Sequence, residues 1–250
     1  MFPIRDHNPS RRTPFVTWAL MAANIVIFLA YYPALSGNPY DLGQFWQDWA
    51  LIPAEVADGR EAYTLFTSMF LHGGWMHLAG NMLFLWVFGD NMEDAFGHLG
   101  FLLFYLVCGI AADGLQIISA PASHVPVVGA SGAIAGVLGG YLLLYPLAKV
   151  DILVILIVFF KTFAVRAWIV LGIWFALQIF GGLSARADEG GVAYWAHAGG
   201  FVAGVVLALP WFLRRGGSAF WNRTEGHPPH PPTATPDRLS PIPVVRRRRR

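Results

Sequence analysis

The sequence has few charged residues. Of its 250 residues, 17 are Lys or Arg and 15 are Asp or Glu, so charged residues make up 13% of the chain, against ~25% in an average soluble domain. This is too little charge to cover the surface of an ordinary soluble fold. Hydrophobic residues make up 56% of the chain, and several windows reach the ~20 apolar residues needed to cross a bilayer. The composition predicts a polytopic membrane protein.

Cysteine is almost absent, and the sequence lacks the pattern of a cleavable signal peptide. Cys108 is the single cysteine and lies in an apolar run, which excludes an intrachain disulfide. Arg5, Arg11 and Arg12 precede the first apolar run, and no clear small-residue cleavage site follows it. We therefore expect the first apolar run to be retained as a membrane span.

Hydropathy predicts six membrane spans and hence an all-α, six-transmembrane-helix bundle. The predicted spans lie near 15–34, 75–92, 99–118, 131–146, 167–182 and 193–213. The run "VDILVILIVFF" at 150–160 is too short to cross alone, and Lys161 and Arg166 separate it from the fifth span. We interpret this run as an interfacial or re-entrant segment. A seventh span at this place is the competing topology.

The distribution of positive charge predicts the orientation. With six spans and the N-terminus inside, all but two of the 17 Lys and Arg residues fall on the inner side, the exceptions being Arg60 and Arg186. By the positive-inside rule both termini face the cytoplasm, and we expect a multi-pass protein of the cell membrane. The predicted organisation is a cytoplasmic segment at 1–12, a membrane domain at 13–213 and a tail at 214–250.

The tail is rich in proline and ends in five arginines at 246–250. Such a composition cannot build a packed core, so we expect the tail to be disordered. The arginines are expected to contact anionic lipid headgroups. Nucleic-acid binding is the less favoured interpretation, because it would depend on charge alone.

Polar residues in the predicted spans gather at one depth. Ser131 begins the fourth span, His197 lies one turn into the sixth, and His77 and Asn81 are four residues apart early in the second. These three spans all run from outside to inside, so all four side chains are expected near the outer face. Because polar groups inside a membrane are costly, the cluster indicates a functional site.

The residue types in this cluster suit nucleophilic catalysis. A serine hydroxyl attacks well only when a base accepts its proton, and an imidazole with a pKa near ~6.5 suits that role. Ser131 is therefore the candidate nucleophile and His197 the candidate base. Donors for an oxyanion would come from the backbone N–H groups of Ser131 and Gly132 and from the side chains of Asn81 and His77.

Small residues surround the candidate nucleophile. Gly129 precedes it and would let a substrate approach the backbone closely. Glycines also recur every four residues in the fourth and sixth spans, which favours close helix packing in lipid. These glycines are Gly132, Gly136 and Gly140, and Gly200 and Gly204.

Each of these features also has a purely structural interpretation. A serine at a helix start is commonly an N-cap. A histidine inside a span often bonds a neighbouring helix, as His77 and Asn81 could. Repeats of small residues occur in many membrane bundles. Only the coincidence of the polar groups at one depth favours catalysis.

Three motifs resemble the rhomboid intramembrane serine proteases. They are "GASGAIAG" at 129–136, "HGGWMHLAGNMLFLWVFGDNMEDAFG" at 72–97 and "WAHAGGFVAG" at 195–204. The resemblance extends over roughly residues 13–213 and implies a Ser131–His197 dyad without a catalytic carboxylate. It assigns oxyanion stabilisation to His77 and Asn81, with His72 as the family's preceding histidine. Glu93 and Gly97 match a structural Glu-x-x-x-Gly motif at the inner end of the second span.

The chain departs from the family pattern at two places. Many members carry Trp-Arg in the first outer loop, where this chain has Tyr63-Thr64. Some members place an aromatic residue one turn after the serine, against the histidine, where this chain has Ala135. Another group should therefore orient His197. Asp113 has no counterpart in the family pattern; we favour a polar contact to a cavity or helix over a role as a triad carboxylate.

The resemblance implies a serine endopeptidase that cleaves single-pass membrane proteins near the outer face. Its partners would be those substrates and membrane lipids, with no nucleic acid, metal or nucleotide cofactor. A non-catalytic relative is less favoured because Ser131 and His197 are intact. A transporter lacks an evident inverted repeat. A zinc protease through His72, His77 and His197 lacks the His-Glu-x-x-His signature.

Overall fold

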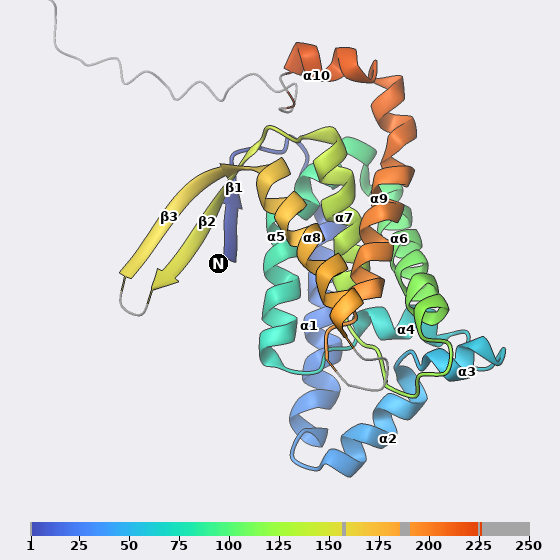
Figure 1. Cartoon of the computed structure of the whole chain (residues 1–250). Helices are drawn as coiled ribbons and strands as arrows, with labels where there is room; N and C mark the ends of the chain where they lie inside the picture. The colour runs from blue at the N-terminus through green and yellow to red at the C-terminus, as the bar shows by residue number, and fades with distance from the viewer. Residues whose placement is uncertain (1, 157–158, 186–190, 225, 227–250) are drawn as a thin grey trace, which may run out of the picture.

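The computed structural model describes residues 2–156, 159–185, 191–224 and 226. Six long helices form a bundle (Figure 1), and each begins and ends within a few residues of a predicted span. They are α1 (Phe15–Leu35), α5 (Trp75–Phe96), α6 (His98–Ser119), α7 (Ser131–Leu144), α8 (Ala167–Ser184) and α9 (Tyr194–Arg214). The predicted polytopic helical bundle is confirmed.

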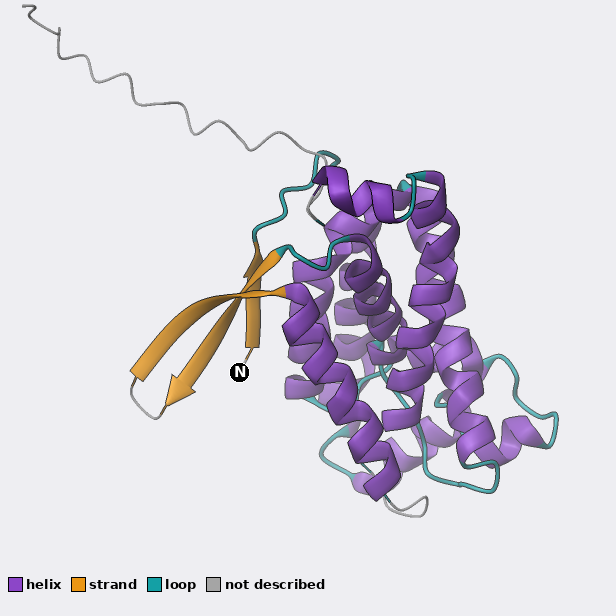
Figure 2. Ribbon diagram, turned by 45° about the horizontal axis from the view of Figure 1, so that its top comes forward, coloured by secondary structure: helices purple, strands orange, loops and turns teal. Residues whose placement is uncertain are grey.

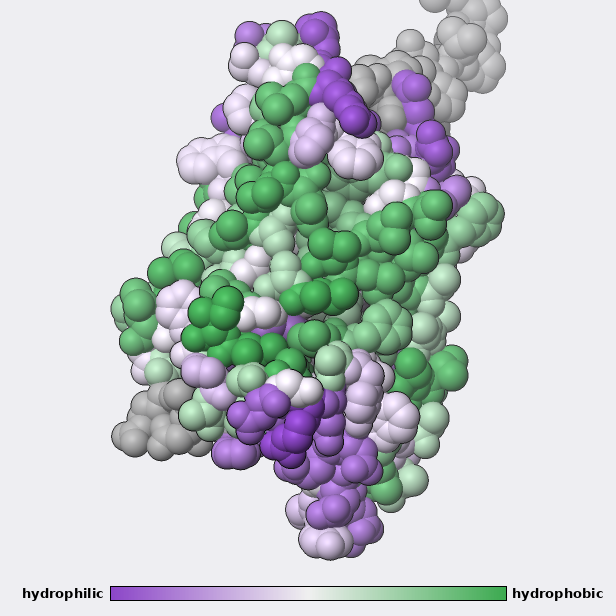
Figure 3. Space-filling view, turned by 90° about the vertical axis from the view of Figure 1, so that its right-hand side faces the viewer, coloured by the Kyte–Doolittle hydropathy of each residue, from purple (hydrophilic) through white to green (hydrophobic). Residues whose placement is uncertain are grey.

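The surface of the bundle fits a membrane. Helices α1, α6, α8 and α9 are each long and apolar enough to span a bilayer, judged by length and composition. Helix α7 is shorter, with 14 residues, and α5 has 22 residues but carries more polar side chains. Figure 3 shows a broad hydrophobic belt between two hydrophilic ends on the face that it presents. The chain is a multi-pass membrane protein.

Short helices mark the two ends of the bundle (Figure 1). Between α1 and α5 lie α2 (Pro39–Trp49), α3 (Pro53–Ala57), α4 (Thr64–Thr67) and the 3-10 helix η1 (Ser68–Phe70). We call the end that carries α2 to α4 the outer end. The opposite end, where α10 (Ser218–Thr224) follows α9, is the inner end.

Helices α7 and α9 pack backbone against backbone through glycine. A Cβ atom placed on Gly200 would collide with the carbonyl oxygen of Gly132, and one on Gly204 would collide with that of Gly136. Most of α7 is buried at the centre of the bundle. The glycine repeats therefore bring the starts of α7 and α9 together, as expected from their spacing.

A small antiparallel sheet stands beside the helices (Figure 2). Its order is β1 (Phe2–Asp6), β2 (Lys149–Leu156), β3 (Phe159–Arg166), with Asp6 opposite Val150 and Lys149 opposite Arg166. The prediction for 150–160 was incomplete. The run pairs as strands, as its β-branched residues favour, and the described residues form no seventh helical span. The strand at the N-terminus was not predicted.

The tail begins with a helix rather than with disorder. Within the segment 214–250 that we expected to be disordered, Ser218–Thr224 forms α10. Phe220 is 2% exposed and its ring lies against that of Phe212, and the Trp221 indole donates to the carbonyl of Leu143 at 3.0 Å. Apolar side chains thus fold this segment onto the inner end. The five arginines at 246–250 lie outside the described residues.

Candidate active site

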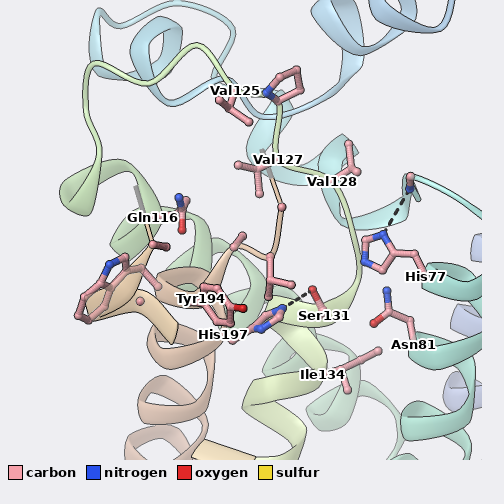
Figure 4. Close-up of a pocket in the computed structure, with 18 of the residues that line it drawn as sticks. His77, Asn81, Gln116, Val125, Val127, Val128, Ser131, Ile134, Tyr194 and His197 are labelled. Carbon is pink, nitrogen blue, oxygen red and sulfur yellow. Dashed lines mark hydrogen bonds between the residues drawn. The ribbon is translucent and has the colours of Figure 1, made fainter. Parts of the chain in front are cut away.

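Ser131 and His197 are in hydrogen-bond contact at the outer end of the bundle. Ser131 is the first residue of α7, and the Oγ atom lies 2.8 Å from Nε2 of His197, one turn into α9 (Figure 4). The N-cap alternative for Ser131 is wrong. Ala130 occupies the cap position, and no side chain caps this helix. The hydroxyl is instead paired with an imidazole, as a nucleophile and base would be.

The second ring nitrogen of His197 and one face of its ring contact α8. Nδ1 of His197 lies 2.8 Å from Oε1 of Gln178, which is 8% exposed. The ring of Trp174 lies over His197 with a centroid distance of 5.8 Å and an interplanar angle of 33°. Position 135 is alanine and offers no aromatic ring to His197. Gln178 and Trp174 contact the imidazole instead. The sequence held one indication of this, a single glutamine in an otherwise apolar span.

His77 and Asn81 face Ser131 from α5 (Figure 4). Nδ1 of His77 accepts a hydrogen bond from the Gly73 N–H at 3.3 Å, so in the neutral ring Nε2 carries the hydrogen. Asn81 is 6% exposed, and its Nδ2 atom is buried without a hydrogen-bond partner among the described residues. Within the described part of the chain, the Asn81 amide and the His77 Nε2–H are therefore two unpaired donors beside the serine.

Gly129 makes the approach of His77 possible. A Cβ atom there would lie 2.8 Å from Cε1 and Nε2 of the His77 ring, and the backbone φ is +132°, in a region that favours glycine. The same Cβ would lie 3.4 Å from Ser131 Oγ. Glycine thus lets the imidazole of His77 reach the backbone directly before Ser131.

These groups share one cavity of about 860 Å³ between α5, α6, α7, α8 and α9. Its polar lining includes His77, Asn81, Gln116, Ser131 and His197, and the chain leading into α7 adds apolar residues such as Val125 and Val127. Figure 4 shows the labelled valines on the side of the cavity away from the Ser131–His197 bond. A concave, largely apolar pocket with a few convergent polar groups is the usual form of a binding site.

His72 lies behind this site. It is fully buried, its ring meets that of His77 edge-on at a centroid distance of 5.2 Å, and its backbone N–H and C=O both bond the Tyr31 hydroxyl. Among the described residues, no three His, Cys, Asp or Glu side chains are arranged to hold a metal ion. The zinc alternative, which needed His72, His77 and His197 together, therefore has no ligand set.

Asp113 contacts the chain that leads to Ser131 and makes no bond to His197 among the described residues. Its Oδ2 atom accepts a hydrogen bond from Ser68 Oγ at 3.3 Å, and the carbonyl of Ser68 accepts from the Gly129 N–H at 2.9 Å. Since Gln178 occupies Nδ1 of His197, the triad role for Asp113 is wrong. The carboxyl group instead helps to hold the Gly129 turn.

The first outer loop is anchored without the Trp-Arg pair. The Tyr63 hydroxyl donates to the carbonyl of Asp48 at 2.7 Å. Thr64 is fully buried, and its hydroxyl donates to the carbonyl of Glu61 at 2.8 Å. Tyr63 and Thr64 thus fix this loop by bonds to the backbone.

Glu93 lies at the inner end, far along α5 from the site. Its carboxylate accepts hydrogen bonds from the backbone N–H groups of Val16 (2.9 Å) and Thr17 (2.8 Å) and from the Thr17 hydroxyl (2.7 Å). Pro14, at the cap position of α1, makes no side-chain cap, so Glu93 caps that helix from a neighbour. Glu93 supports the fold and not the catalytic geometry.

Comparison with known proteins places these features in one family. Residues 59–214, more than half of the chain, match the Rhomboid domain. The chain is 32% identical over 166 residues to "Rhomboid-like protein 11, chloroplastic" of Arabidopsis thaliana, covering 63% of this chain and 54% of the relative. It is 27% identical over 207 residues to "Rhomboid protein 1, mitochondrial" of Saccharomyces cerevisiae, covering 80% and 54%.

A bacterial relative shows a similar level of identity. "Rhomboid protease GluP" of Bacillus subtilis is 36% identical over 129 residues, covering 52% of this chain and 24% of the relative. The chain spans about half the length, or less, of the curated relatives it matches. The domain match includes the serine, the histidine and the α5 motif together, and on this ground the chain belongs to the rhomboid family.

Proposed function

We propose that this chain is an intramembrane serine endopeptidase that cuts transmembrane segments of single-pass proteins near the outer face of the membrane. One observation carries the proposal: Ser131 Oγ lies 2.8 Å from His197 Nε2 in a cavity with unpaired donors. Family membership supports the same activity, since one relative is named a protease.

The geometry supports the following sequence of steps. Ser131 Oγ attacks the scissile carbonyl carbon while Nε2 of His197 takes the hydroxyl proton. The tetrahedral intermediate collapses, the C–N bond breaks, and the imidazolium gives its proton to the leaving amine. A water molecule then attacks the acyl-enzyme, again with His197 as base, and releases the second product with Ser131 regenerated.

The oxyanion would be held by backbone and side-chain donors together. The first N–H groups of α7 have no intrahelical acceptor, and those of Ser131 and Gly132 stand beside the nucleophile. Asn81 Nδ2 and the His77 Nε2–H add side-chain donors. Leaving a buried donor unpaired costs about 1–3 kcal/mol, so an unpaired Asn81 amide is best explained by an acceptor that arrives with the reaction.

The position of the site suggests the substrate. The cavity lies at the outer end of a bundle whose middle is apolar, so a peptide bond reaching it would come from a membrane segment near the bilayer surface. A helical segment must unwind to expose its carbonyl, which is easiest near a helix end. We infer a single-pass membrane protein as the substrate class, and lipids as the surroundings in which it is met.

Orientation and location follow from the charge distribution. Arg11, Arg12, Lys149, Arg214 and Arg215 flank the inner ends of the helices, which supports a cytoplasmic inner end and cytoplasmic termini in a cell membrane. Some relatives are named as chloroplastic or mitochondrial. Surface labelling tests the orientation. With Cys108 replaced by Ala, Ser36→Cys should react with an impermeant thiol reagent in intact cells and Ser218→Cys should not. The reverse pattern would overturn it.

Cleavage of defined segments tests the activity. The purified protein in lipid vesicles is mixed with labelled single transmembrane segments, and fragments are identified by mass spectrometry. We expect a cut near the outer end of a segment, insensitive to a chelator and lost in Ser131→Ala. Cleavage that persists in Ser131→Ala, or that a chelator abolishes, contradicts the serine mechanism. Binding of the segments without any cut identifies a non-catalytic relative.

A further inference from the structure

The candidate base has a partner on each ring nitrogen, and only one of them is explained by the dyad. Nε2 of His197 meets Ser131, and Nδ1 meets the side-chain oxygen of Gln178 at 2.8 Å. Gln178 is 8% exposed and is held on α8, whereas the dyad residues lie on α7 and α9. A third helix therefore contacts the catalytic pair through one polar side chain.

The orientation of the Gln178 amide is fixed by its own second bond. Its Nε2 atom donates to the backbone carbonyl of Trp174, one turn earlier in α8, at 3.2 Å. The amide oxygen is thereby left facing His197. An amide oxygen can only accept, so the hydrogen of a neutral imidazole must lie on Nδ1. The lone pair then lies on Nε2, toward the hydroxyl of Ser131.

We propose that Gln178 is a positioning residue that selects the Nδ1–H tautomer of His197 and so makes the ring a base toward Ser131. In a free histidine side chain the Nε2–H tautomer is the more stable one. That tautomer would point a hydrogen at the serine hydroxyl and leave no acceptor for its proton. The proposal rests on the proposed function, because it assigns a role to Gln178 within the same dyad.

A neutral amide suits this place in the fold. A carboxylate at the same position would also accept from Nδ1–H, as in a triad, but it would bring a buried charge into an apolar helix at considerable cost. The amide takes up no proton in the reaction. When Ser131 loses its proton to Nε2, the imidazolium keeps Nδ1–H bonded to Gln178, and the proton leaves again from Nε2.

Trp174 limits the remaining freedom of the ring. A hydrogen bond at each nitrogen still permits some tilt of the imidazole, and the indole of Trp174 lies over one face of it. Both Trp174 and Gln178 lie on α8, four residues apart and therefore on one side of that helix. Helix α8 is set against the start of α9 by glycine: a Cβ atom on Gly182 would lie 3.0 Å from the Trp195 ring.

Three variants separate positioning from packing. Gln178→Leu keeps the volume and removes the acceptor, Gln178→Glu keeps an acceptor and adds charge, and Gln44→Leu makes the same change on the exposed face of α2. We expect Gln178→Leu to lower kcat by roughly 10- to 100-fold with little change in KM, below the ~10⁴-fold loss that a wrong tautomer causes in a triad. Gln44→Leu should keep wild-type turnover.

The conservative variant gives a second readout. Gln178→Glu should restore most of the kcat lost in Gln178→Leu, because a carboxylate oxygen can again accept from Nδ1–H. A negative charge beside the ring favours the imidazolium, so the acidic limb of the kcat–pH profile should move to higher pH than in the wild type. If Gln178 had only a structural role, its substitution would change neither the acidic limb of the kcat–pH profile nor the ratio of kcat to KM.

Nitrogen NMR tests the tautomer without any need for proteolysis. In protein labelled with ¹⁵N in the histidine rings, the His197 signals are assigned as those missing from His197→Phe. We expect a protonated Nδ1 and an unprotonated Nε2 in the wild type, and loss of this preference in Gln178→Leu. An Nε2–H ring in the wild type overturns the proposal, as do unchanged His197 signals in Gln178→Leu accompanied only by a lower Tm.

The two readouts distinguish the possible failures. If the wild type cleaves no segment yet shows the Nδ1–H ring only when Gln178 is present, the positioning role stands and the proposed protease function falls. If the wild type cleaves segments and Gln178→Leu keeps both its kcat and its ring signals, the protease function stands and the positioning role falls.

Discussion

The two ends of α5 use buried polar side chains in opposite ways. At the inner end, the Glu93 carboxylate is fully buried and accepts from Val16, Thr17 and the neighbouring His98 ring. At the outer end, Asn81 is 6% exposed and its amide nitrogen has no partner among the described residues. One helix therefore carries a satisfied polar group and an unsatisfied one.

The difference separates structure from function. A buried group with all its bonds made gains nothing further from a ligand, and its removal weakens the resting fold. A buried donor with no bond weakens the resting fold slightly and gains when a charged acceptor forms beside it. Substitutions at the inner end should therefore change stability, and those at the outer end should change turnover.

The largest expected effect is at the dyad. Ser131→Ala and His197→Ala should each reduce cleavage to the background rate, and the double variant should be no slower than either single one, because the two residues act as a unit. Among the residues that the structure describes, the Ser131 side chain bonds only His197, so Ser131→Ala should keep its Tm. The measurement is kcat and Tm on the same purified samples. A double variant clearly slower than both single variants would show that the residues act independently.

Next comes Asn81. If its amide donates to the oxyanion, Asn81→Ala should lower kcat by roughly 10- to 1000-fold with little change in KM; the lower end reflects the donors that remain at His77 and Gly132. Its matched control is Asn91→Ala on the same helix. Asn91 is also buried, but its amide already donates to the carbonyl of Asn8 at 2.5 Å.

For the control variant we expect the opposite changes in kcat and Tm. Asn91→Ala should lower Tm and leave the kcat of the folded protein near the wild-type value. If instead Asn81→Ala lowers only Tm, by the equivalent of about 0.6 kcal/mol as for a typical interhelical bond, Asn81 is structural. His77→Ala should follow Asn81→Ala, since both side chains line the same cavity.

A substitution of Glu93 tests the inner end of α5. Glu93→Gln keeps the shape but turns part of the acceptor into a donor that faces the first turn of α1. We expect a loss of about 1.5–3 kcal/mol in stability, the range for hydrogen bonds to charged groups, with kcat unchanged in the fraction that stays folded. A fall in kcat without a fall in Tm would mean that the inner end is coupled to the site.

The sequence predicted the spans well and the sheet poorly. The six helices follow from long apolar runs bounded by charge and glycine, which are local features. The segment 150–166 carries a short β-branched run that periodicity alone cannot assign. Its pairing with Phe2–Asp6, about 150 positions earlier, is a contact that local patterns do not encode.

The candidate site likewise contains residues that could be grouped from the sequence and one that could not. Ser131, His197, His77 and Asn81 could be grouped from sequence because the span topology sets their depth. Gln178 could not, because its role depends on the rotation of α8 toward His197, which is set by glycine–aromatic contacts such as that of Gly182 with Trp195. For Asp113 the favoured interpretation, a polar contact, agrees with its bond from Ser68, but depth alone does not tell which neighbour a side chain meets, so the partner could not be named from sequence.

The smallest expected effect is a pH dependence confined to the inner end. Asp6 of β1 accepts a hydrogen bond from the Tyr141 hydroxyl at 2.8 Å, and burial, together with the charge of Asp90, raises the pKa of Asp6 to about 7. The folded state therefore holds a proton that the unfolded state releases near pH ~3.9. Stability should fall as pH rises from about 4 to 7 and then level off.

Asp6→Asn tests this effect, because an amide cannot titrate. The decrease in Tm between pH 5 and pH 8 should be smaller in Asp6→Asn than in the wild type. The contribution of one such group stays below ~1.4 kcal/mol for each pH unit, and partial exposure of Asp6 lowers it further. The matched comparison is Asp58→Asn, an exposed carboxylate at the outer end, which should leave the pH dependence of Tm unchanged. If Asp6→Asn keeps the full wild-type decrease, the titrating group lies elsewhere.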